Sequence, residues 1–344
     1  MRLPRLRTRL FCTVFLFALV SASPAAERRP RVILLESMPV SVVLEHSRWF
    51  ARGLSDLGHP AGSGAELVRL EANGNRERAE ILLRDALAKF RPDLVVTNAT
   101  LASQAAAPIL AEAGIPQLFL TVSDPVGAGL IREVGVPAEN NVTGMVHALP
   151  RDTKLKMAMR LIGQAVEPRP IRLGFIHSGN PSSRGDLKKL REAAAKRGDV
   201  VFLGREVPYR EIPNGMRDLM ADVTSAVRAM DDQVDGWFEP SGPLGELPAY
   251  TRRILETSAK PIVFGNRLDS ARQGALLHMT PDPERSGREA ARLAVDILNG
   301  RNPGDIPPVP PSLFKVGVHL GTALDLGITV PPDILALAGE DVFR

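Results

Sequence analysis

Apolar residues recur along this chain with two different periods, and the periods alternate. Between residues 79 and 90 they are spaced three and four positions apart, as on one face of an amphipathic helix: Ala79, Leu82, Leu83, Ala86, Leu87 and Phe90. Short apolar runs, such as residues 93–97 and 117–121, are instead typical of buried strands. Strands that alternate with helices predict a parallel sheet covered by helices on both faces.

This alternation occurs twice, which predicts an α/β protein with two lobes. For the first series we expect strands at 31–35, 93–97 and 117–121 and helices at 44–57, 79–90 and 100–113. For the second we expect strands at 171–176, 200–203, 236–238 and 261–264 and helices at 183–196, 214–230 and 245–258. Residues 140–150 lie between the two series and are the expected first crossover.

The C-terminal part contains a helix at 284–299, a proline-rich segment at 301–311 and a strand at 313–320. Proline fixes its own φ angle and restricts the residue before it, so the proline-rich segment suits a stiff connection that crosses between lobes. A flexible tail is the alternative, but an apolar strand follows the segment, which favours the crossing segment.

Residues 1–26 have the layout of a secretory signal peptide. Four arginines precede the apolar run 10–20, and small residues follow it at 21–26. The run is too short to span a bilayer as a stable helix, which disfavours an uncleaved anchor. We therefore expect cleavage between Ala22 and Ala26 and export to the periplasm.

Loss of this leader changes the charge and the cysteine content. The formal net charge of +4 falls to zero because the leader carries four arginines and no acid, so the sequence pI of about 9.4 does not indicate a nucleic-acid partner. The only cysteine, Cys12, begins the apolar run, whereas a lipid-modified cysteine would follow it. The exported chain then has no thiol for a disulfide or a nucleophile.

Catalytic and cofactor motifs are missing from the sequence. The six histidines lack metal-ligand spacing, and there is no GxSxG elbow, Walker A loop or EF-hand loop. "GAGLIR" (127–132) carries Arg132 where a dinucleotide fingerprint has its third glycine. A hydrolase that uses Ser123 and Asp124 with His46 or His147 is the enzymatic alternative, but nothing pairs these residues as nucleophile and base. We expect neither an enzyme, nor a metal site, nor a cofactor.

Short polar residues instead gather where the predicted strands end. Ligands of open parallel sheets bind outside the carboxyl ends of the strands, and the helix N-termini that follow favour anions. The same residue types also cap helices and shape turns, so the prediction depends on their repetition in both lobes. The predicted ligand-binding residues are Glu36, Ser37, Thr97, Asn98, Thr100, Thr121, Ser123, Asp124, Ser178, Asn180, Ser182, Glu239, Ser241, Asn266 and Asp269.

Several segments resemble a known family from about residue 31 to the C-terminus. They are "RPDLVV" (91–96), "SDPVGAGLI" (123–131), "NNVTGM" (140–145), "FGNRLDSARQGAL" (264–276) and "GTALDLGITVPPDILALA" (321–338). Together they resemble the ABC-transporter substrate-binding proteins of the tryptophan/tyrosine-type group, which are class I periplasmic binding proteins. The Asp-Pro-Val-Gly-Ala-Gly-Leu run and Asn-Val-Thr-Gly are the most specific pieces.

The resemblance implies two Rossmann-like lobes with parallel sheets, joined by three crossovers and closing like a hinge on a small solute. By this analogy the first lobe holds residues 30–146 plus 279–306, and the second holds 147–278 plus 307–344. The proline-rich segment falls at the third crossover. Ser123 and Asp124 would lie on the cleft rim, with Pro125 starting a helix, unless this motif only shapes a turn.

The sequence departs from the family in loops that matter for specificity. Ser47 replaces a common proline, residues 239–242 ("EPSG") replace a Pro-Thr-Asp loop, and residues 266–268 ("NRL") replace an acidic stretch. The aromatic residue usual near 279–287 is absent, and aromatic residues make up only 5% of the chain. An aromatic amino acid is therefore disfavoured as the ligand.

Together these features predict an exported, monomeric receptor that presents a small polar solute, such as an amino acid or a related carboxylate, to an ABC permease of the inner membrane. Hydroxyl groups and helix N-termini of the first lobe would bind the anionic end, and Glu239 or Asp269 of the second lobe would pair with a cationic group. The alternative is a periplasmic sensory protein that reports to a membrane signalling protein. The sequence does not separate these two functions.

Overall fold

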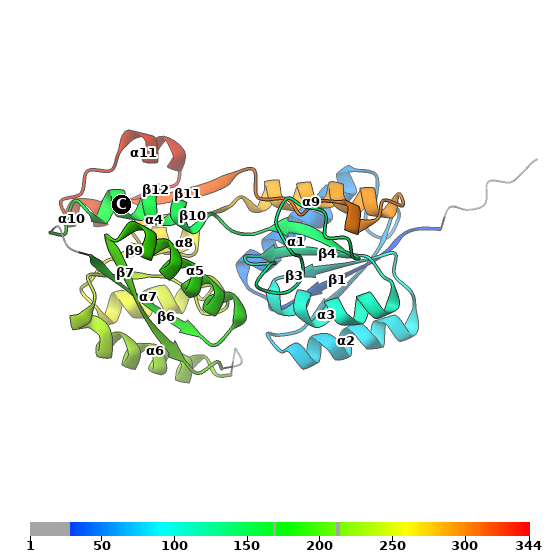
Figure 1. The fold of residues 1–344 in the computed structure, drawn as a ribbon, viewed down its shortest axis with the longest axis horizontal. Helices are drawn as coiled ribbons and strands as arrows, with labels where there is room; N and C mark the ends of the chain where they lie inside the picture. Colours follow the sequence, from blue (N-terminus) through cyan, green and yellow to red (C-terminus); the bar gives the residue numbers. More distant parts are fainter. Residues whose placement is uncertain (1–27, 168–169, 211–213) are drawn as a thin grey trace, which may run out of the picture.

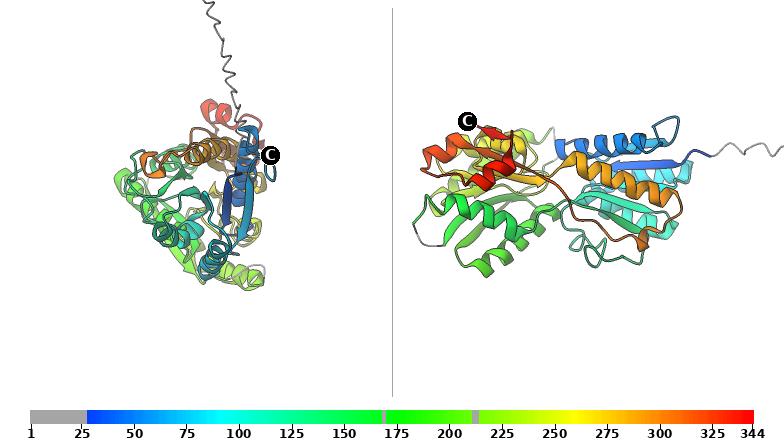
Figure 2. Two further views of the ribbon diagram at one scale, coloured as in Figure 1. Left: turned by 90° about the vertical axis from the view of Figure 1, so that its right-hand side faces the viewer. Right: turned by 90° about the horizontal axis from the view of Figure 1, so that it is seen from above.

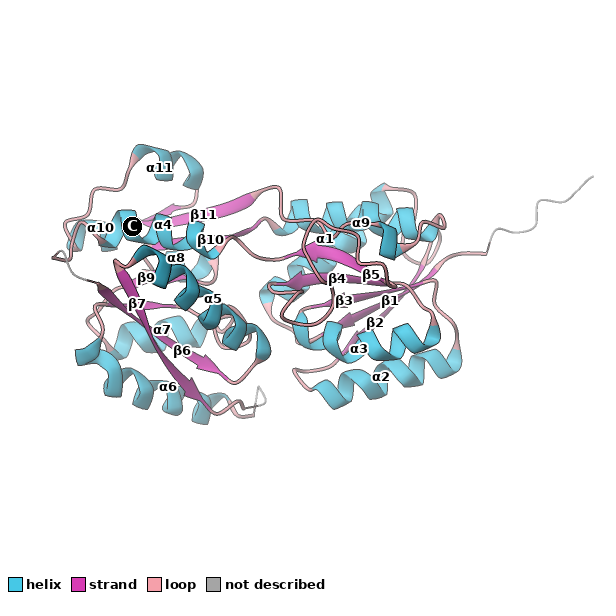
Figure 3. Cartoon of the chain, viewed as in Figure 1, coloured by secondary structure: helices cyan, strands magenta, loops and turns pink. Residues whose placement is uncertain are grey.

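The computed structural model describes residues 28–167, 170–210 and 214–344. The predicted signal peptide, residues 1–26, lies outside the described residues. The described chain forms two α/β lobes side by side, each with a central sheet between helices (Figures 1 and 3). None of the helices in this part of the chain is both long and apolar enough to cross a membrane.

The first lobe contains a five-stranded parallel sheet in the order β2-β1-β3-β4-β5. Alternate residues of strand β1 face opposite layers: Val32 and Leu34 pack toward helices α1 and α9, whereas Ile33 and Leu35 pack toward α2 and α3. The strands are β1 Arg31–Glu36, β2 Glu66–Glu71, β3 Leu94–Asn98, β4 Gln117–Val122 and β5 Val142–Val146. The helices are α1 Ser41–Asp56, α2 Arg76–Lys89, α3 Thr100–Ala113 and α9 Pro283–Leu298.

The second lobe contains a seven-stranded sheet in the order β12-β11-β10-β9-β8-β6-β7. Its pairs are parallel except β10 with β11, which are antiparallel, so this sheet is parallel-dominated rather than wholly parallel. The strands are β6 Ile171–Ser178, β7 Val200–Val207, β8 Gly236–Phe238, β9 Ile262–Gly265, β10 Leu277–Pro281, β11 Phe314–His319 and β12 Val342–Phe343. The helices are α4 Arg151–Ile162, α5 Pro181–Arg197, α6 Met216–Met230, α7 Pro248–Thr257, α8 Leu268–Gln273, α10 Leu320–Asp325 and α11 Pro332–Ala338.

The chain crosses between the lobes three times: after β5, after β10, and along the proline-rich segment between the short 3₁₀ turn Pro303–Asp305 and β11 (Figure 2). The third crossing segment is hydrogen-bonded to β5, the strand that leads into the first crossover. The Val309 N–H donates to the Gly144 carbonyl, and the Val146 N–H donates to the Val309 carbonyl, both at 2.9 Å. The proline-rich segment is therefore an ordered crossover, as its composition predicts.

The second crossover lies later in the sequence than the expected lobe boundary between residues 278 and 279. β10 remains in the second sheet up to Pro281, which is paired with Phe314 of β11. The chain enters the first lobe only with α9, whose Ala290 and Ala291 pack in the core against Phe50 of α1.

Pro125 does not start a helix, contrary to the expectation from the family resemblance. Residues 125–129 form a tight turn in which the Ala128 N–H donates to the Asp124 carbonyl at 2.9 Å. Gly129 has a φ angle of 73°, in the left-handed region that glycine adopts most readily, so the chain turns back instead of continuing as a helix. The motif thus shapes a turn at the end of β4.

Candidate functional site

A cavity of about 520 Å³ lies between the two lobes. One wall comes from the loops after β1, β3 and β4 and from the first turns of α1; the other comes from the first turn of α4 and the loops that precede α5, α7 and α8. Residues 147–149 of the first crossover and 279–284, which run from the end of β10 to the start of α9, close the remaining side. The carboxyl ends of several parallel strands thus face one shared cleft.

The cleft collects residues from both lobes among those that the sequence predicts. Nine of the predicted residues line it: Ser37, Thr100, Thr121, Ser123, Asn180, Ser182, Ser241, Asn266 and Asp269. Some of them also have the structural role that their residue type predicts. Asn180 accepts the Ser182 N–H at 3.1 Å as the N-cap of α5 and still borders the cavity.

Six predicted residues do not line the cavity: Glu36, Thr97, Asn98, Asp124, Ser178 and Glu239. Each is turned inward or held by another group. The Glu36 carboxylate accepts the Arg69 guanidinium at 2.7 Å. The Ser178 hydroxyl is buried and has no hydrogen-bond partner within the described chain.

Thr97 and Asn98 at the end of β3 hold neighbouring elements together. The Thr97 hydroxyl shares a hydrogen bond with Ser103 at 2.9 Å. The Asn98 amide donates to the Val43 carbonyl at 2.9 Å and to the Ser47 hydroxyl at 2.8 Å, which ties α1 to the sheet. Its carbonyl oxygen accepts the Thr121 hydroxyl. Both side chains are fully buried, so they position the cleft residues rather than face the cavity.

Asp124 connects the two lobes. One of its carboxylate oxygens accepts the Gly127 N–H at 2.9 Å and lies 2.6 Å from Lys189 Nζ on α5 of the second lobe. Burial opposes ionisation, but the bonds from Lys189 and Gly127 outweigh it and lower the pKa of Asp124. A second contact joins the lobes where the Tyr209 hydroxyl donates to the Gly74 carbonyl at 3.4 Å.

Glu239 is the clearest correction to the predicted site. Its carboxylate is 1% exposed and accepts the hydroxyls of Thr251 and Ser270 at 2.6 and 2.7 Å and the Asn266 N–H at 2.7 Å. Burial raises the pKa of Glu239 against the opposing effect of these bonds. The side chain braces the loops after β8 and β9 and is not available to pair with a solute.

Glu246 is the partly buried carboxyl that faces the cleft in its place. Its Oε1 accepts the Asn266 amide at 2.6 Å. Burial raises the pKa of Glu246 to about 7, against the opposing charge of Arg267 and with a further contribution from Glu45 in the first lobe. Glu246 was not predicted from the sequence, because an isolated glutamate in a loop usually lies in solvent.

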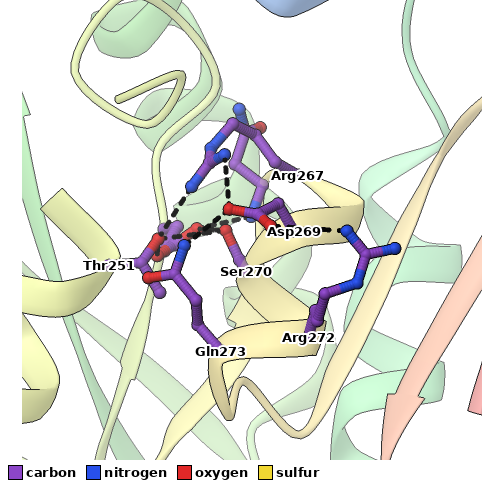
Figure 4. Close-up of polar contacts among 8 residues, drawn as sticks. Thr251, Arg267, Asp269, Ser270, Arg272 and Gln273 are labelled. Carbon is purple, nitrogen blue, oxygen red and sulfur yellow. Dashed lines mark hydrogen bonds and ion pairs between the residues drawn. The ribbon is translucent and has the colours of Figure 1, made fainter. Parts of the chain in front are cut away.

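Asp269 lines the cleft but already has three partners (Figure 4). It accepts Arg267 Nη1 at 3.2 Å and the Gln273 amide at 2.6 Å, and Arg272 Nη1 lies 3.5 Å away. Burial would raise the pKa of Asp269, but the hydrogen bond from Gln273 and the charge of Arg267 lower it overall. Arg267 itself keeps a buried Nε without a partner in the described chain.

Lys154, in the first turn of α4, is the most buried cation of the cleft lining, with 7% of the residue exposed. Its Nζ lies 5.3 Å from the centre of the Phe264 ring. Burial lowers the pKa of Lys154, partly offset by the charge of Asp186. The sequence does contain a signal for the burial of Lys154. Ala158 and Leu161 follow it by four and seven residues, which places Lys154 on the apolar face of its helix.

Two neutral imidazoles border the cleft where α1 meets the first crossover. The His46 and His147 rings pack edge to face with centroids 4.8 Å apart. His46 Nδ1 is bonded to the Val42 carbonyl at 2.7 Å, and burial lowers the pKa of His46 to about 4. The pKa of His147 is also lowered, mainly by burial and further by the charge of Lys154.

The geometry does not assemble the hydrolase alternative. Within the described chain no hydrogen bond joins Ser123 to a histidine, and the Asp124 carboxylate is held by Lys189 and Gly127. No three histidine, cysteine, aspartate or glutamate side chains of this part of the chain are grouped as a metal site. Trp49 is the only phenylalanine, tyrosine or tryptophan among the lining residues, and the guanidinium groups of Arg48 and Arg288 each lie 5.3 Å from its ring.

Comparison with known proteins gives a family and several relatives. The family described as ABC transporter substrate binding protein matches residues 40–342. A tyrosine-binding protein of Clostridioides difficile (strain R20291) is 24% identical over 281 residues, which cover 79% of this chain and 75% of the relative.

Two solved structures share the fold. An ABC domain from Streptococcus pneumoniae in complex with L-Trp has a TM-score of 0.77 at 20% identity and covers 92% of this chain and 100% of that one. A conserved domain protein from Vibrio cholerae O1 biovar El Tor has a TM-score of 0.74 at 22% identity, with the same coverage of 92% and 100%.

These similarities confirm the predicted type I periplasmic binding protein fold with its two lobes. The family match covers the residues that line the cavity except Ser37 and Met38. The family and the relatives are solute-binding proteins, not enzymes. The chain belongs to the ABC transporter substrate binding protein family.

Proposed function

We propose that this protein is the exported receptor of an ABC import system and that it binds a small polar solute, an amino acid or a related carboxylate, between its lobes. The observation that carries the proposal is the cleft of about 520 Å³ with polar and charged residues on both walls. Clefts of roughly 300 to 1,000 Å³ with a few convergent polar groups are typical of small-molecule sites. The predicted leader supports a periplasmic location, and family membership supports an ABC permease as partner.

Hinge closure is the proposed mechanism. A solute that contacts both walls binds the closed arrangement more tightly than an open one, and therefore shifts the population toward closure. The contact of Asp124 with Lys189 and that of Tyr209 with Gly74 add to the closed state across the cleft. The permease would then recognise the surface that only the closed lobes form.

The two walls differ in what they offer a solute. The first lobe supplies the uncharged hydroxyls of Thr100, Thr121 and Ser123, which orient a polar group as donors or acceptors. A cationic group of the solute is assigned to Glu246, because the oxygens of Glu239 are bonded within the second lobe. The buried charges available to a solute thus lie on the second lobe, whereas the charged lining residues Glu45 and Arg48 of the first lobe are exposed.

Mass spectrometry of the small molecules that leave the purified protein on denaturation tests this function directly. The refolded, solute-free protein is then heated with the recovered compound and with the twenty common L-amino acids. A solute present at 100 times its Kd should stabilise the folded state by about 2.7 kcal/mol and raise Tm. Absence of any bound compound and of any Tm shift would refute the proposal.

A steric block of the cleft separates specific binding from surface effects. Ser123 lines the cavity and is only partly exposed, so the Ser123→Trp variant should lose the solute-induced rise in Tm. The matched control is Ser63→Trp, at an exposed serine of the loop before β2. Equal responses of the two variants would place the bound solute outside the cleft.

A further inference from the structure

We infer that Lys154 is the anion-binding residue of the cleft and that it selects solutes that carry a carboxylate. This assignment rests on the proposed solute-binding function and deepens it, since it places the negative end of the solute on the second lobe. The sequence analysis expected hydroxyls and helix N-termini of the first lobe in that role.

The position of Lys154 follows from the topology. α4 begins directly after the first crossover, so its first turn lies at the junction of the lobes. Ala158 and Leu161, on the same face of α4, are fully buried against the second sheet. Lys154 therefore points inward from α4, and its side chain ends at the cavity that it helps to line.

No hydrogen bond or ion pair within the described chain engages Lys154 Nζ directly, and its identified contact is the face of Phe264. The nearest influence of an acid is the charge of Asp186, which Lys154 shares with Arg151. Lysine is rarely buried unless it is paired, because loss of hydration disfavours the charged form. A solute carboxylate in the cleft would supply the missing counter-charge.

The acids near Lys154 are already engaged. Asp186 is fully buried; its Oδ1 lies 2.9 Å from Arg151 Nη2, and its Oδ2 accepts the Ser241 N–H at 3.1 Å. Arg151 and Lys154 thus share one carboxylate and leave one positive charge in excess. Glu246, the other carboxyl whose charge acts on Lys154, accepts the Asn266 amide and has its pKa raised to about 7.

The histidines nearby are neutral and add no positive charge to that of Lys154. Burial lowers the pKa of His46 to about 4 and that of His278 to about 3, so both rings are uncharged at neutral pH. His278 Nδ1 bonds the Gly265 carbonyl at 3.0 Å, which leaves its Nε2 as an acceptor rather than a cation. Lys154 is then the buried cation of the described lining that has no ion pair of its own, whereas Arg267 pairs with Asp269.

Calorimetric titration with matched acids and amides tests the assignment. The probes are L-tyrosine, L-tryptophan, L-leucine and L-glutamate, each beside its α-carboxamide, together with the neutral solutes tagatose and glycerol. The solute-free wild-type protein should bind at least one acid about 10-fold or more tightly than its amide. Lys154→Gln should weaken binding of that acid by about 10-fold or more and leave affinity for the amide within about 3-fold.

Two further variants distinguish recognition from a structural role. Lys156→Gln removes an exposed lysine of the same helix and should leave every affinity unchanged. Lys154→Arg keeps the positive charge and should retain the preference for the acid. Urea denaturation checks that each variant is folded.

The outcomes separate the assignment from the function on which it rests. If the acid binds Lys154→Gln as tightly as wild type, or if acid and amide lose affinity equally, the Lys154 assignment is wrong and solute binding stands. If tagatose or glycerol binds and no acid does, the assignment also fails. If no probe binds the wild-type protein, both the assignment and the proposed amino-acid class of solute are refuted.

Discussion

The Asp186→Ala exchange should destabilise the second lobe by about 3 to 5 kcal/mol. Asp186 is fully buried and holds Arg151, whose side chain is only 9% exposed, at 2.9 Å. It also satisfies the Ser241 N–H at 3.1 Å. Removal of one partner of a buried ion pair costs about this much, because the other charge stays buried without compensation. Lys154 adds to the cost, since its charge interacts with the same carboxylate.

Urea denaturation followed by circular dichroism measures the loss. The matched control is Asp199→Ala, because Asp199 pairs with Arg197 at 2.6 Å while their side chains are 47% and 29% exposed. An exposed pair contributes about 0 to 1 kcal/mol, so this variant should stay close to wild type. The double exchange Arg151→Met with Asp186→Leu should recover part of the stability, because no unpaired guanidinium remains while Lys154 and the Ser241 N–H still lose the carboxylate.

The pH dependence provides an independent check of the same reasoning. Burial opposes ionisation of Asp186, but the charges of Lys154 and Arg151 and the bonds from Ser241 lower its pKa overall. The folded state therefore holds the Asp186 proton less tightly than the unfolded chain. The stabilisation by the ion pair is present above the pKa of the unfolded chain and is lost as the pH falls through the pKa of the folded state.

A loss of less than about 1 kcal/mol in the free energy of unfolding of Asp186→Ala at pH 7 would refute the assignment of a buried ion pair.

Three further predictions follow from other contacts. Gly287→Val should cost about 1 to 3 kcal/mol in urea denaturation, because a Cβ at this position would lie 2.6 Å from Trp49 Cβ between α9 and α1; unchanged stability would contradict this close approach. Lys189→Gln removes the ion pair with Asp124 that joins the lobes, so the radius of gyration measured by small-angle scattering should increase. An unchanged radius would show that this pair does not hold the lobes together. Burial raises the pKa of Glu246 from 4.5 to about 7, so the free energy of unfolding should fall by up to about 3 kcal/mol as the pH rises from 4.5 to 7. Glu246→Gln should abolish this fall. A pH profile of stability in the variant identical to that of wild type would refute the prediction.

The fold could be predicted from the sequence where strands are buried on both faces. β3 and β4 are fully buried and read as continuous apolar runs. β2 was not predicted, because this edge strand is half-exposed and its sequence "ELVRLE" mixes charged and apolar residues. β5 was read only as a crossover, because the short segment "VTGMV" continues directly into the first connection between the lobes.

The candidate site was predictable as a region but not residue by residue. Hydroxyl and amide side chains at strand ends serve equally well to face a cleft, as Ser123 does, or to tie loops together, as Asn98 does. The choice depends on the direction of each side chain in three dimensions, which the order of residues does not contain. Lys154 and Glu246 were missed for the opposite reason, since lysine and glutamate are usually exposed and only the packed lobe encloses them.

The distribution of charge between the two walls indicates how substitutions can change the solute that such a cleft prefers without preventing the lobes from closing. The first lobe contributes hydroxyls such as those of Thr100 and Ser123, which accept or donate and so tolerate solutes of either sign. The buried charges of the cleft lie on the second lobe, at Lys154 and at Arg267, which pairs with Asp269. The interlobe contact of Asp124 with Lys189 lies outside the cavity lining. Exchange of a few second-lobe side chains would therefore alter the preferred solute charge without removing the contacts that join the lobes.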